Sequence, residues 1–271
     1  MRPLESFDSG AGDKGQPMGM LVRKLSRHTS FGSADRVALG ALVGHQVRAL
    51  RHRALAERDV GAGGASGPIH IMLSGWTCRF AMLPSGRRRI LAFYLPGDIC
   101  DFDLFTARQV DQPIAAIGAA RIAAVERRAL RQAMNRQPQI ERAYWSEAAL
   151  DAAIQRTWTI NVGHRAADRR LAHLLCELHV RIGGNGATDH AGVSFPLTQA
   201  DLGDACGLTS IHTNRAIQEL RRAGLLELNA GVLRIHDWAG LCAMASFDPA
   251  YLTIVRDDAD EDAASERRAA G

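Results

Sequence analysis

One stretch of this chain constrains the fold more than any other, residues 197–226 with the sequence LTQADLGDACGLTSIHTNRAIQELRRAGLL. Thr198 followed by Asp201 has the spacing of a capping box, so a helix is expected to begin there. Gly203 leaves room for a second helix to cross closely, and Gly207 suits the positive φ with which helices often end. The stretch therefore predicts two short helices joined by a tight turn.

The second of these helices has one apolar and one polar face. Thr209 is placed to cap it, and a buried stripe is expected from the spacing of Thr213, Ile217 and Leu220. The residues of the opposite face are Ser210, His212, Asn214, Arg215 and Gln218. Such hydroxyl, imidazole, amide and guanidinium groups bond base edges and phosphates, and a helix-turn-helix places them in the major groove of DNA. The pattern predicts a DNA-reading head.

A hairpin is predicted directly after the second helix. Two short apolar runs, residues 225–228 and 232–235, flank the turn sequence Asn229-Ala230-Gly231. The head is thus predicted to be a winged helix-turn-helix. Two rival interpretations remain: a pair of capped helices from another fold, and a scaffold whose head contacts protein instead of DNA.

Charge and cysteine content limit the class of protein. Lys and Arg total 33 against 29 Asp and Glu, an excess that permits a nucleic-acid partner without requiring one. The five cysteines are odd in number and form no CxxC pair, which suits a reducing compartment. No apolar run has the length of a membrane span, and the start lacks the apolar core of a signal peptide. We therefore expect a cytoplasmic protein with no membrane partner.

One spacing admits a metal ion. His173, Cys176 and His179 recur at steps of three on a predicted helix, so their side chains share one face. The other interpretation is a partly buried seam, and it is the one we prefer because such sets are more often structural. We expect neither a metal nor a cofactor.

Short strands are predicted in the N-terminal half, and they indicate an antiparallel roll. Turn residues such as Ser74-Gly75 and Pro96-Gly97-Asp98 separate them. The predicted strands are residues 69–73, 77–83, 89–95, 114–117 and 121–125. Helices are then expected over 127–136, 138–162 and 165–182. Both flanks of helix 138–162 are apolar, so one stripe is expected to pack on the roll and the other on a second copy, making a homodimer. A wholly intramolecular helix is the alternative.

The chain resembles the cyclic-AMP-receptor/fumarate-nitrate-regulator (CRP/FNR) superfamily of bacterial transcription regulators over residues 37–245. The motifs that carry the resemblance are the head sequence above, LSGWTCRFAMLPSGRRRILAFYLPGD over 73–98, and NVGHRAADRRLAHLLCEL over 161–178. The resemblance implies an α+β fold: an antiparallel β-roll like a cyclic-nucleotide-binding domain, a dimerisation helix and a C-terminal winged head. It also implies promoter DNA and RNA polymerase as partners, and no enzymatic activity.

The resemblance assigns roles to residues of the head. By motif position, Thr198 and Gln199 touch phosphate, and Thr209 and His212 lie near the DNA backbone. The residues that face bases are Ser210, Asn214 and Arg215. The family's basic residue and glutamate for guanine and cytosine are here Ser210 and Ile211, so the target sequence is expected to differ.

The sensor roll departs from the family's cyclic-nucleotide site. Binders carry Gly-Glu for the ribose and Arg-Ser or Arg-Thr for the phosphate, whereas residues 97–105 contain no glutamate and residues 111–115 no arginine. Asp101, Asp103 and Asp111 add negative charge without a compensating cation, so cyclic AMP is not expected to bind. The cysteine cluster of the oxygen sensors is missing too. The tentative effector pocket comprises Cys100, Asp101, Phe102 and Gln112.

The sequence thus predicts a dimeric transcription regulator with an unidentified small-molecule effector. One alternative keeps the DNA-binding head and leaves the roll without a ligand, so that activity follows abundance. Another is a cupin-like enzyme, against which the predicted strands contain only His70 as a metal-ligating histidine. The expected segments are a disordered start over 1–20, the sensor roll over 21–136, the dimerisation helix over 137–163, the DNA-binding domain over 164–247 and a tail over 248–271.

Overall fold

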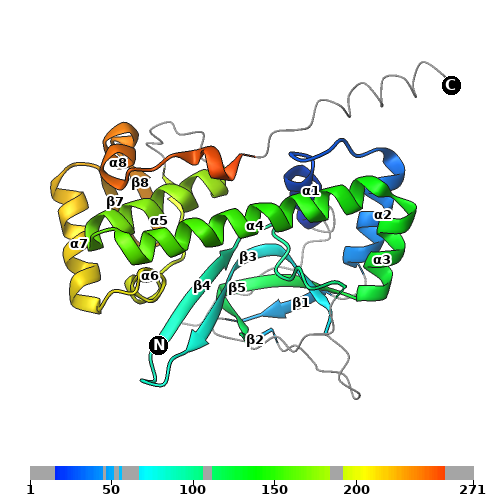
Figure 1. Cartoon of the computed structure of the whole chain (residues 1–271), viewed down its shortest axis with the longest axis horizontal. Helices are drawn as coiled ribbons and strands as arrows, with labels where there is room; N and C mark the ends of the chain where they lie inside the picture. The colour runs from blue at the N-terminus through cyan, green and yellow to red at the C-terminus, as the bar shows by residue number, and fades with distance from the viewer. Residues whose placement is uncertain are drawn as a thin grey trace, which may run out of the picture.

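The structure is a computed structural model of the chain. The residues that it describes are 16–44, 47–51, 55–56, 67–105, 112–183 and 192–253. Figure 1 shows three parts: a sheet with helices at one end, a long helix, and a head built of helices and a small sheet. The long helix, α4 (Pro138–His164), runs across both other parts. This order agrees with the α+β fold expected from the sequence.

The roll is an antiparallel sheet with strand order β1-β5-β3-β4, and β2 pairs with β5 on the edge opposite to β3. Its strands are β1 (Val47–Leu50), β2 (Leu55–Ala56), β3 (Ile69–Met82), β4 (Arg88–Tyr94) and β5 (Ile114–Val125). The long strands β3 and β5 pair with each other and carry most of the buried residues of the sheet. They form its middle.

The prediction of separate short strands over 69–83 and 114–125 is wrong. In β3 the pairing with β5 shifts register on either side of Ser74, and Gly75 has a φ of +72°. A Cβ on Gly75 would lie 2.1 Å from the carbonyl oxygen of Ala119, so no other residue fits there. Gly118 of β5 also has a φ of +72°. The glycines that suggested turns mark β-bulges, which bend a strand without ending it.

Helices close one end of the roll. They are α1 (Gln16–Leu25), α2 (Ser33–Gly44) and α3 (Arg127–Arg136). The expectation of disorder up to residue 20 is wrong for its last part, because α1 begins at Gln16; residues 1–15 lie outside the described ranges. Leu21 and Leu25 of α1 are buried in one cluster with Ile69 of β3, and this burial holds the helix on the sheet.

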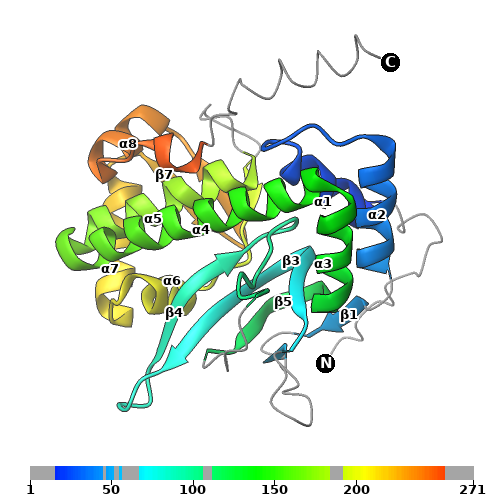
Figure 2. The same ribbon diagram turned by 45° about the vertical axis from the view of Figure 1, so that its right-hand side comes forward.

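The long helix α4 starts at Pro138, as the sequence predicts, because proline suits the first turn of a helix. Helix α5 (Ala167–Ile182) follows and runs beside α4 in both Figure 1 and Figure 2. The four leucines predicted for its core face are buried: Leu171, Leu174, Leu175 and Leu178. Among the described helices, none is long and apolar enough to cross a membrane.

The head contains the predicted helix pair and hairpin. Its elements are β6 (Val193–Ser194), α6 (Gln199–Cys206), α7 (Ser210–Arg222), β7 (Leu226–Asn229), β8 (Val232–Ile235) and α8 (Trp238–Ala245). The sheet order is β6-β8-β7. The turn residues Ala230 and Gly231 both have positive φ, 50° and 76°, as a tight two-residue hairpin requires. The predicted hairpin is confirmed.

The expected tail does not begin at residue 248. A 3₁₀ turn, η1 (Pro249–Leu252), packs against the head and α4. The hydroxyl of Tyr251 donates to Oε2 of the buried Glu177 at 2.8 Å, so one hydrogen bond fixes this turn to α5. No sequence pattern predicts this contact, because its partners are 74 residues apart.

Candidate nucleic-acid interface

The first helix of the pair, α6, begins with the predicted capping box. The Thr198 hydroxyl accepts from the backbone N–H of Asp201 at 3.1 Å, and Asp201 Oδ2 accepts from the backbone N–H of Thr198 at 2.9 Å. Burial would raise the pKa of Asp201, but hydrogen bonds from Thr198 and Arg88 outweigh it and lower the pKa below the usual value. The carboxylate is therefore held in its charged form at the start of the helix.

Two glycines set the angle between α6 and α7. Gly207 ends α6 with a φ of +67°, in the left-handed region that the sequence predicted. A Cβ on Gly203 would lie 2.8 Å from the hydroxyl oxygen of Thr213 on α7. Glycine thus lets the two helices cross at close range.

The second helix, α7, has the predicted cap and the predicted buried stripe. Thr209 accepts from the backbone N–H of His212 at 3.3 Å. The buried residues of α7 are Thr213, Ala216, Ile217 and Leu220. Because the stripe faces the interior of the head, the other face of α7 points outward.

All seven residues that the sequence assigns to DNA are exposed; they are Thr198, Gln199, Thr209, Ser210, His212, Asn214 and Arg215. Asn214 Nδ2 donates to Gln199 Oε1 at 3.3 Å, so the structure brings α6 and α7 together at this surface. Arg215 pairs with Glu219 at 2.9 Å, with side chains 76% and 37% exposed. An exposed pair of this spacing is worth about 0.3–0.5 kcal/mol, so a ligand can displace it at little cost.

The roll holds the head through an arginine that the sequence analysis missed. Arg88 Nη2 lies 2.5 Å from Asp201 Oδ1, and Arg88 Nε lies 2.8 Å from Asp204 Oδ2. Its neighbour Arg87 donates to the carbonyl of Leu208 at 3.4 Å, at the turn between α6 and α7. Figure 1 and Figure 2 both show β4 beside α6. The run Gly86-Arg87-Arg88-Arg89, which leads into the predicted strand 89–95, was the available signal.

A second ion network joins the roll to α5. Asp98 Oδ2 lies 2.9 Å from Arg181 Nη2, and its Oδ1 bonds Lys24 of α1. Lys24 also lies 3.0 Å from Glu147 of α4. Burial would raise the pKa of Asp98, but Lys24 and Arg181 outweigh it and hold that pKa below its usual value. The network fixes α1, the roll, α4 and the head to one another.

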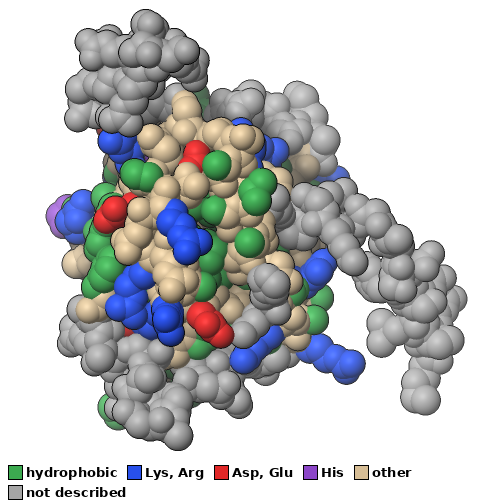
Figure 3. Space-filling model, turned by 90° about the vertical axis from the view of Figure 1, so that its right-hand side faces the viewer, with side chains coloured by type: hydrophobic (Ala, Val, Ile, Leu, Met, Phe, Trp, Pro, Cys, Tyr) green, Lys and Arg blue, Asp and Glu red, His purple; other side chains and the backbone are tan. Residues whose placement is uncertain are grey.

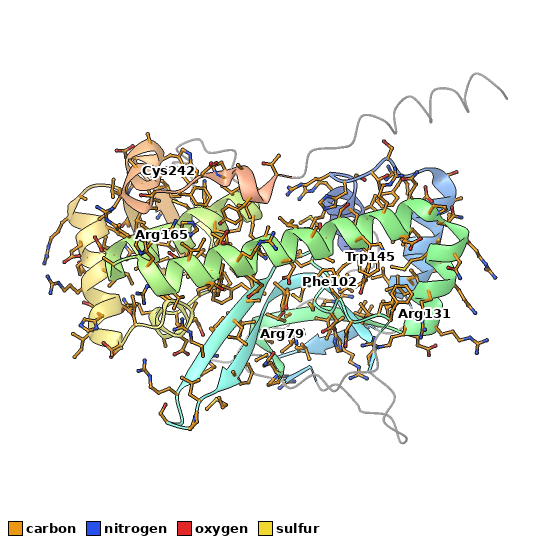
Figure 4. All side chains as sticks on the ribbon, viewed as in Figure 1. Arg79, Phe102, Arg131, Trp145, Arg165 and Cys242 are labelled. Carbon is orange, nitrogen blue, oxygen red and sulfur yellow. The ribbon has the colours of Figure 1, made fainter. Side chains whose placement is uncertain are left out.

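Arg79 of β3, labelled in Figure 4, hydrogen-bonds to three of the four residues of the tentative effector pocket. Its Nε donates to the Tyr94 hydroxyl at 3.0 Å and its Nη1 to the Gln112 carbonyl at 3.0 Å. Its Nη2 donates to the Cys100 carbonyl at 2.8 Å and to Asp101 Oδ1 at 2.7 Å. The expectation that no cation stands near the acidic residues is therefore wrong for Asp101. It is also wrong for Asp103, whose Oδ1 lies 2.9 Å from Arg127 Nη2, and Asp111 lies outside the described residues. The guanidinium of Arg79 is already hydrogen-bonded to groups of the protein itself.

Little space remains at the tentative pocket. Cys100 and Asp101 are buried, and the ring of Phe102 packs on Tyr144 with centroids 5.4 Å apart. The cavity that Phe102 lines measures about 60 Å³, room for a few water molecules, whereas pockets for small organic ligands run to several hundred. Gln112 does not line this cavity.

A larger groove lies at the other end of the roll. It measures about 760 Å³ between α2 and α3, and small apolar residues such as Ala38, Ala41, Ala129 and Ala133 line it. Figure 3 faces this end of the molecule and shows apolar side chains there among basic ones. None of the four tentative effector residues lines the groove.

The residues considered for a metal pack on aromatic rings instead. His173 stacks on Tyr251 with centroids 6.2 Å apart and meets the edge of Phe247 at 5.2 Å. His179 contacts Trp238 with centroids 5.2 Å apart, and Cys176 is fully buried. Burial, together with Arg165, lowers the pKa of His173 to about 4. These residues form a buried seam of the head.

Comparison with known proteins identifies the head and the whole architecture. Residues 169–244 match the Crp-like helix-turn-helix domain. The nitrogen fixation regulation protein FixK of Bradyrhizobium diazoefficiens is 28% identical over 65% of this chain and 73% of its own length. The transcriptional activatory protein AadR of Rhodopseudomonas palustris is 25% identical over 83% and 91%. The solved structure of FixK2 from Bradyrhizobium japonicum covers 75% of this chain and 98% of its own, with a TM-score of 0.61 at 22% identity.

These matches and the geometry of the head define a class: a transcription regulator that binds DNA through a winged helix-turn-helix. The head belongs to the Crp-like helix-turn-helix domains, and the chain as a whole is similar to bacterial transcription regulators of the CRP/FNR superfamily. The matched relatives are named as transcription regulators, which favours the regulator over the cupin-like alternative.

Proposed function

We propose that this regulator binds a palindromic promoter site as a homodimer, with one α7 in the major groove of each half-site. The observation that carries the proposal is the outward face of α7, on which polar side chains stand exposed at the N-terminal end of a helix. Helix-turn-helix proteins read DNA with this end of the second helix, and dimers read half-sites about one helical turn apart.

Roles within the interface follow from position. Thr198 and Gln199 lie at the N-terminus of α6, where backbone N–H groups also favour a phosphate. Ser210, Asn214 and Arg215 face the bases, and Arg215 is the side chain able to fork onto guanine. Thr209 and His212 flank them beside the DNA backbone.

An exposed seam on α4 supports the homodimer. Its members are Trp145, Ala149, Ala152, Arg156, Thr159 and Gly163. They recur at alternating steps of four and three, the spacing at which two helices pack as a coiled coil. The side chain of Trp145 is 47% exposed and that of Ile160, beside the seam, is 57% exposed. A second α4 would cover this apolar surface.

The roll is proposed not to use cyclic AMP, because Arg79 is engaged internally and the cavity at Phe102 is far smaller than a nucleotide. The same observations support the alternative of a roll without a ligand, as far as the tentative pocket is concerned. Cys100, Asp101, Phe102 and Gln112 then serve to hold the roll together. RNA polymerase is the proposed partner of the bound dimer, since a regulator acts through transcription.

Footprinting and sedimentation test the proposal together. The wild-type chain is expected to sediment as a dimer and to protect two half-sites. Ala152→Asp places a charge in the seam and is expected to give a monomer with weaker, unsymmetrical protection. Gln132→Asp adds the same charge on the exposed face of α3 and should change neither. A wild-type monomer that protects one half-site would contradict the proposal.

A further inference from the structure

One side chain on the outward face of α7 has no evident role in folding. Ile211 is 77% exposed, more than any other large apolar side chain among the described residues. It is the second residue of α7 and stands outside the buried stripe that begins at Thr213. An exposed isoleucine at this position adds nothing to the core of the head.

The surroundings of Ile211 are polar and belong to the DNA-facing surface. Ser210, His212, Asn214 and Arg215 are all exposed on the same end of α7. Within this group, Ile211 alone has a side chain that can neither donate nor accept a hydrogen bond. Placed against a polar base edge, it would leave donors or acceptors of the DNA without partners, which is costly.

The major groove offers one apolar feature to such a side chain, the C5 methyl group of thymine. We propose that Ile211 contacts a thymine methyl group in each half-site and so selects thymine at that position. This inference rests on the proposed reading of DNA by α7. A β-branched residue in a helix is held largely to one rotamer, so the contact surface of Ile211 is fixed before DNA binds.

The contact also accounts for selection against cytosine. Cytosine presents an amino donor in the major groove, and a carboxylate at this position would accept from it. Isoleucine cannot accept, so a cytosine here loses hydrogen bonds to water and gains none. The position is therefore expected to read thymine by shape and apolar contact.

Deoxyuridine tests the proposal, because it differs from thymidine by the methyl group alone. Each thymine of a binding site selected from random DNA is replaced in turn, and affinity is measured for wild-type protein and for Ile211→Ala. Wild-type protein is expected to lose about four-fold at one thymine per half-site, equivalent to the ~0.8 kcal/mol of one buried methyl group. Ile211→Ala should bind the thymine and deoxyuridine sites equally well.

Arg215→Ala is the matched control, since it should weaken binding yet keep the deoxyuridine effect. Melting curves of both variants should match the wild type because both side chains are exposed. If wild-type protein binds a specific site but no deoxyuridine substitution weakens it, or if Ile211→Ala keeps the loss, the assignment to Ile211 is wrong. Absence of any sequence-specific site would instead overturn the proposed reading by α7 as well.

Discussion

Arg79 in the roll and Arg215 in the head are residues of the same type in opposite environments. The side chain of Arg79 is 13% exposed, and its guanidinium bonds groups of its own chain, among them Tyr94 and Asp101. Arg215 is 76% exposed and makes a single surface pair with Glu219. Polar groups that hydrogen-bond to one another inside a protein stabilise its fold, whereas polar groups exposed at the surface are available to bind a partner. On this criterion the head carries a binding surface, and the tentative pocket of the roll is structural.

The largest expected effect is on the stability of the roll. Arg79→Ala leaves the buried carboxylate of Asp101 without its guanidinium, so the free energy of unfolding should fall by about 3–5 kcal/mol. Arg215→Ala should change it by less than about 0.5 kcal/mol. Urea denaturation of the two variants measures the contrast.

Arg79→Lys sharpens this comparison, since lysine keeps the charge and loses the planar fork. It should fall between the wild type and Arg79→Ala. Equal stability of all three proteins would show that the internal bonds of Arg79 do not hold the roll.

Within the head, buried His173 should make stability depend on pH. Its pKa of about 4 lies below the usual 6.5, so between these values the unfolded chain binds a proton that the folded chain does not. Stability should therefore fall as the pH drops from about 6.5 toward 4, by on the order of 2–3 kcal/mol in all. His173→Gln should flatten the slope of unfolding free energy between pH 6.5 and 5. An unchanged slope would mean that His173 is protonated in the folded protein.

DNA affinity is expected to depend on Arg215. Arg215→Ala is expected to cost on the order of 1–3 kcal/mol on the specific site and to relax the preference at one base pair per half-site. Titrations on specific and random DNA measure both effects. An equal loss on the two DNAs would make Arg215 a phosphate contact.

Cyclic nucleotides should have the smallest effect, because we expect them not to bind the roll. A ligand bound at 100 times its Kd would stabilise the protein by about 2.7 kcal/mol, enough to shift a melting curve. Millimolar cyclic AMP or cyclic GMP should leave both melting and DNA affinity unchanged. A clear rise in melting temperature, lost on Arg79→Ala, would place a nucleotide site in the roll.

The head was predictable because its signals are local. Thr198 and Asp201 are three residues apart, and the helix cap they form depends on no distant partner. Gly207 indicates a positive φ, and this conformation depends only on the geometry of a single turn. The hairpin residues Asn229-Ala230-Gly231 act in the same way. Local rules are therefore sufficient to predict the candidate interface without knowledge of tertiary contacts.

The contacts that shape the roll are not local, and for that reason the sequence did not reveal them. Arg79 and Asp101 are 22 residues apart, and Arg88 and Asp201 are 113 apart. The glycines of β3 and β5 are equally compatible with a turn and a bulge, and only the pairing of the two strands decides between them. A pattern of residue types cannot show which arginine meets which carboxylate.

Selection of bound sequences from a random DNA pool is the direct test of whether a dimer reads a symmetric site with α7. We expect a two-fold symmetric motif whose half-sites are centred about one helical turn apart, because two exposed α7 helices joined by the α4 seam meet the same face of the duplex. Each half-site should contain a guanine that depends on Arg215. An asymmetric motif, a single half-site, or no enriched motif would contradict the dimer and the reading surface proposed for α7.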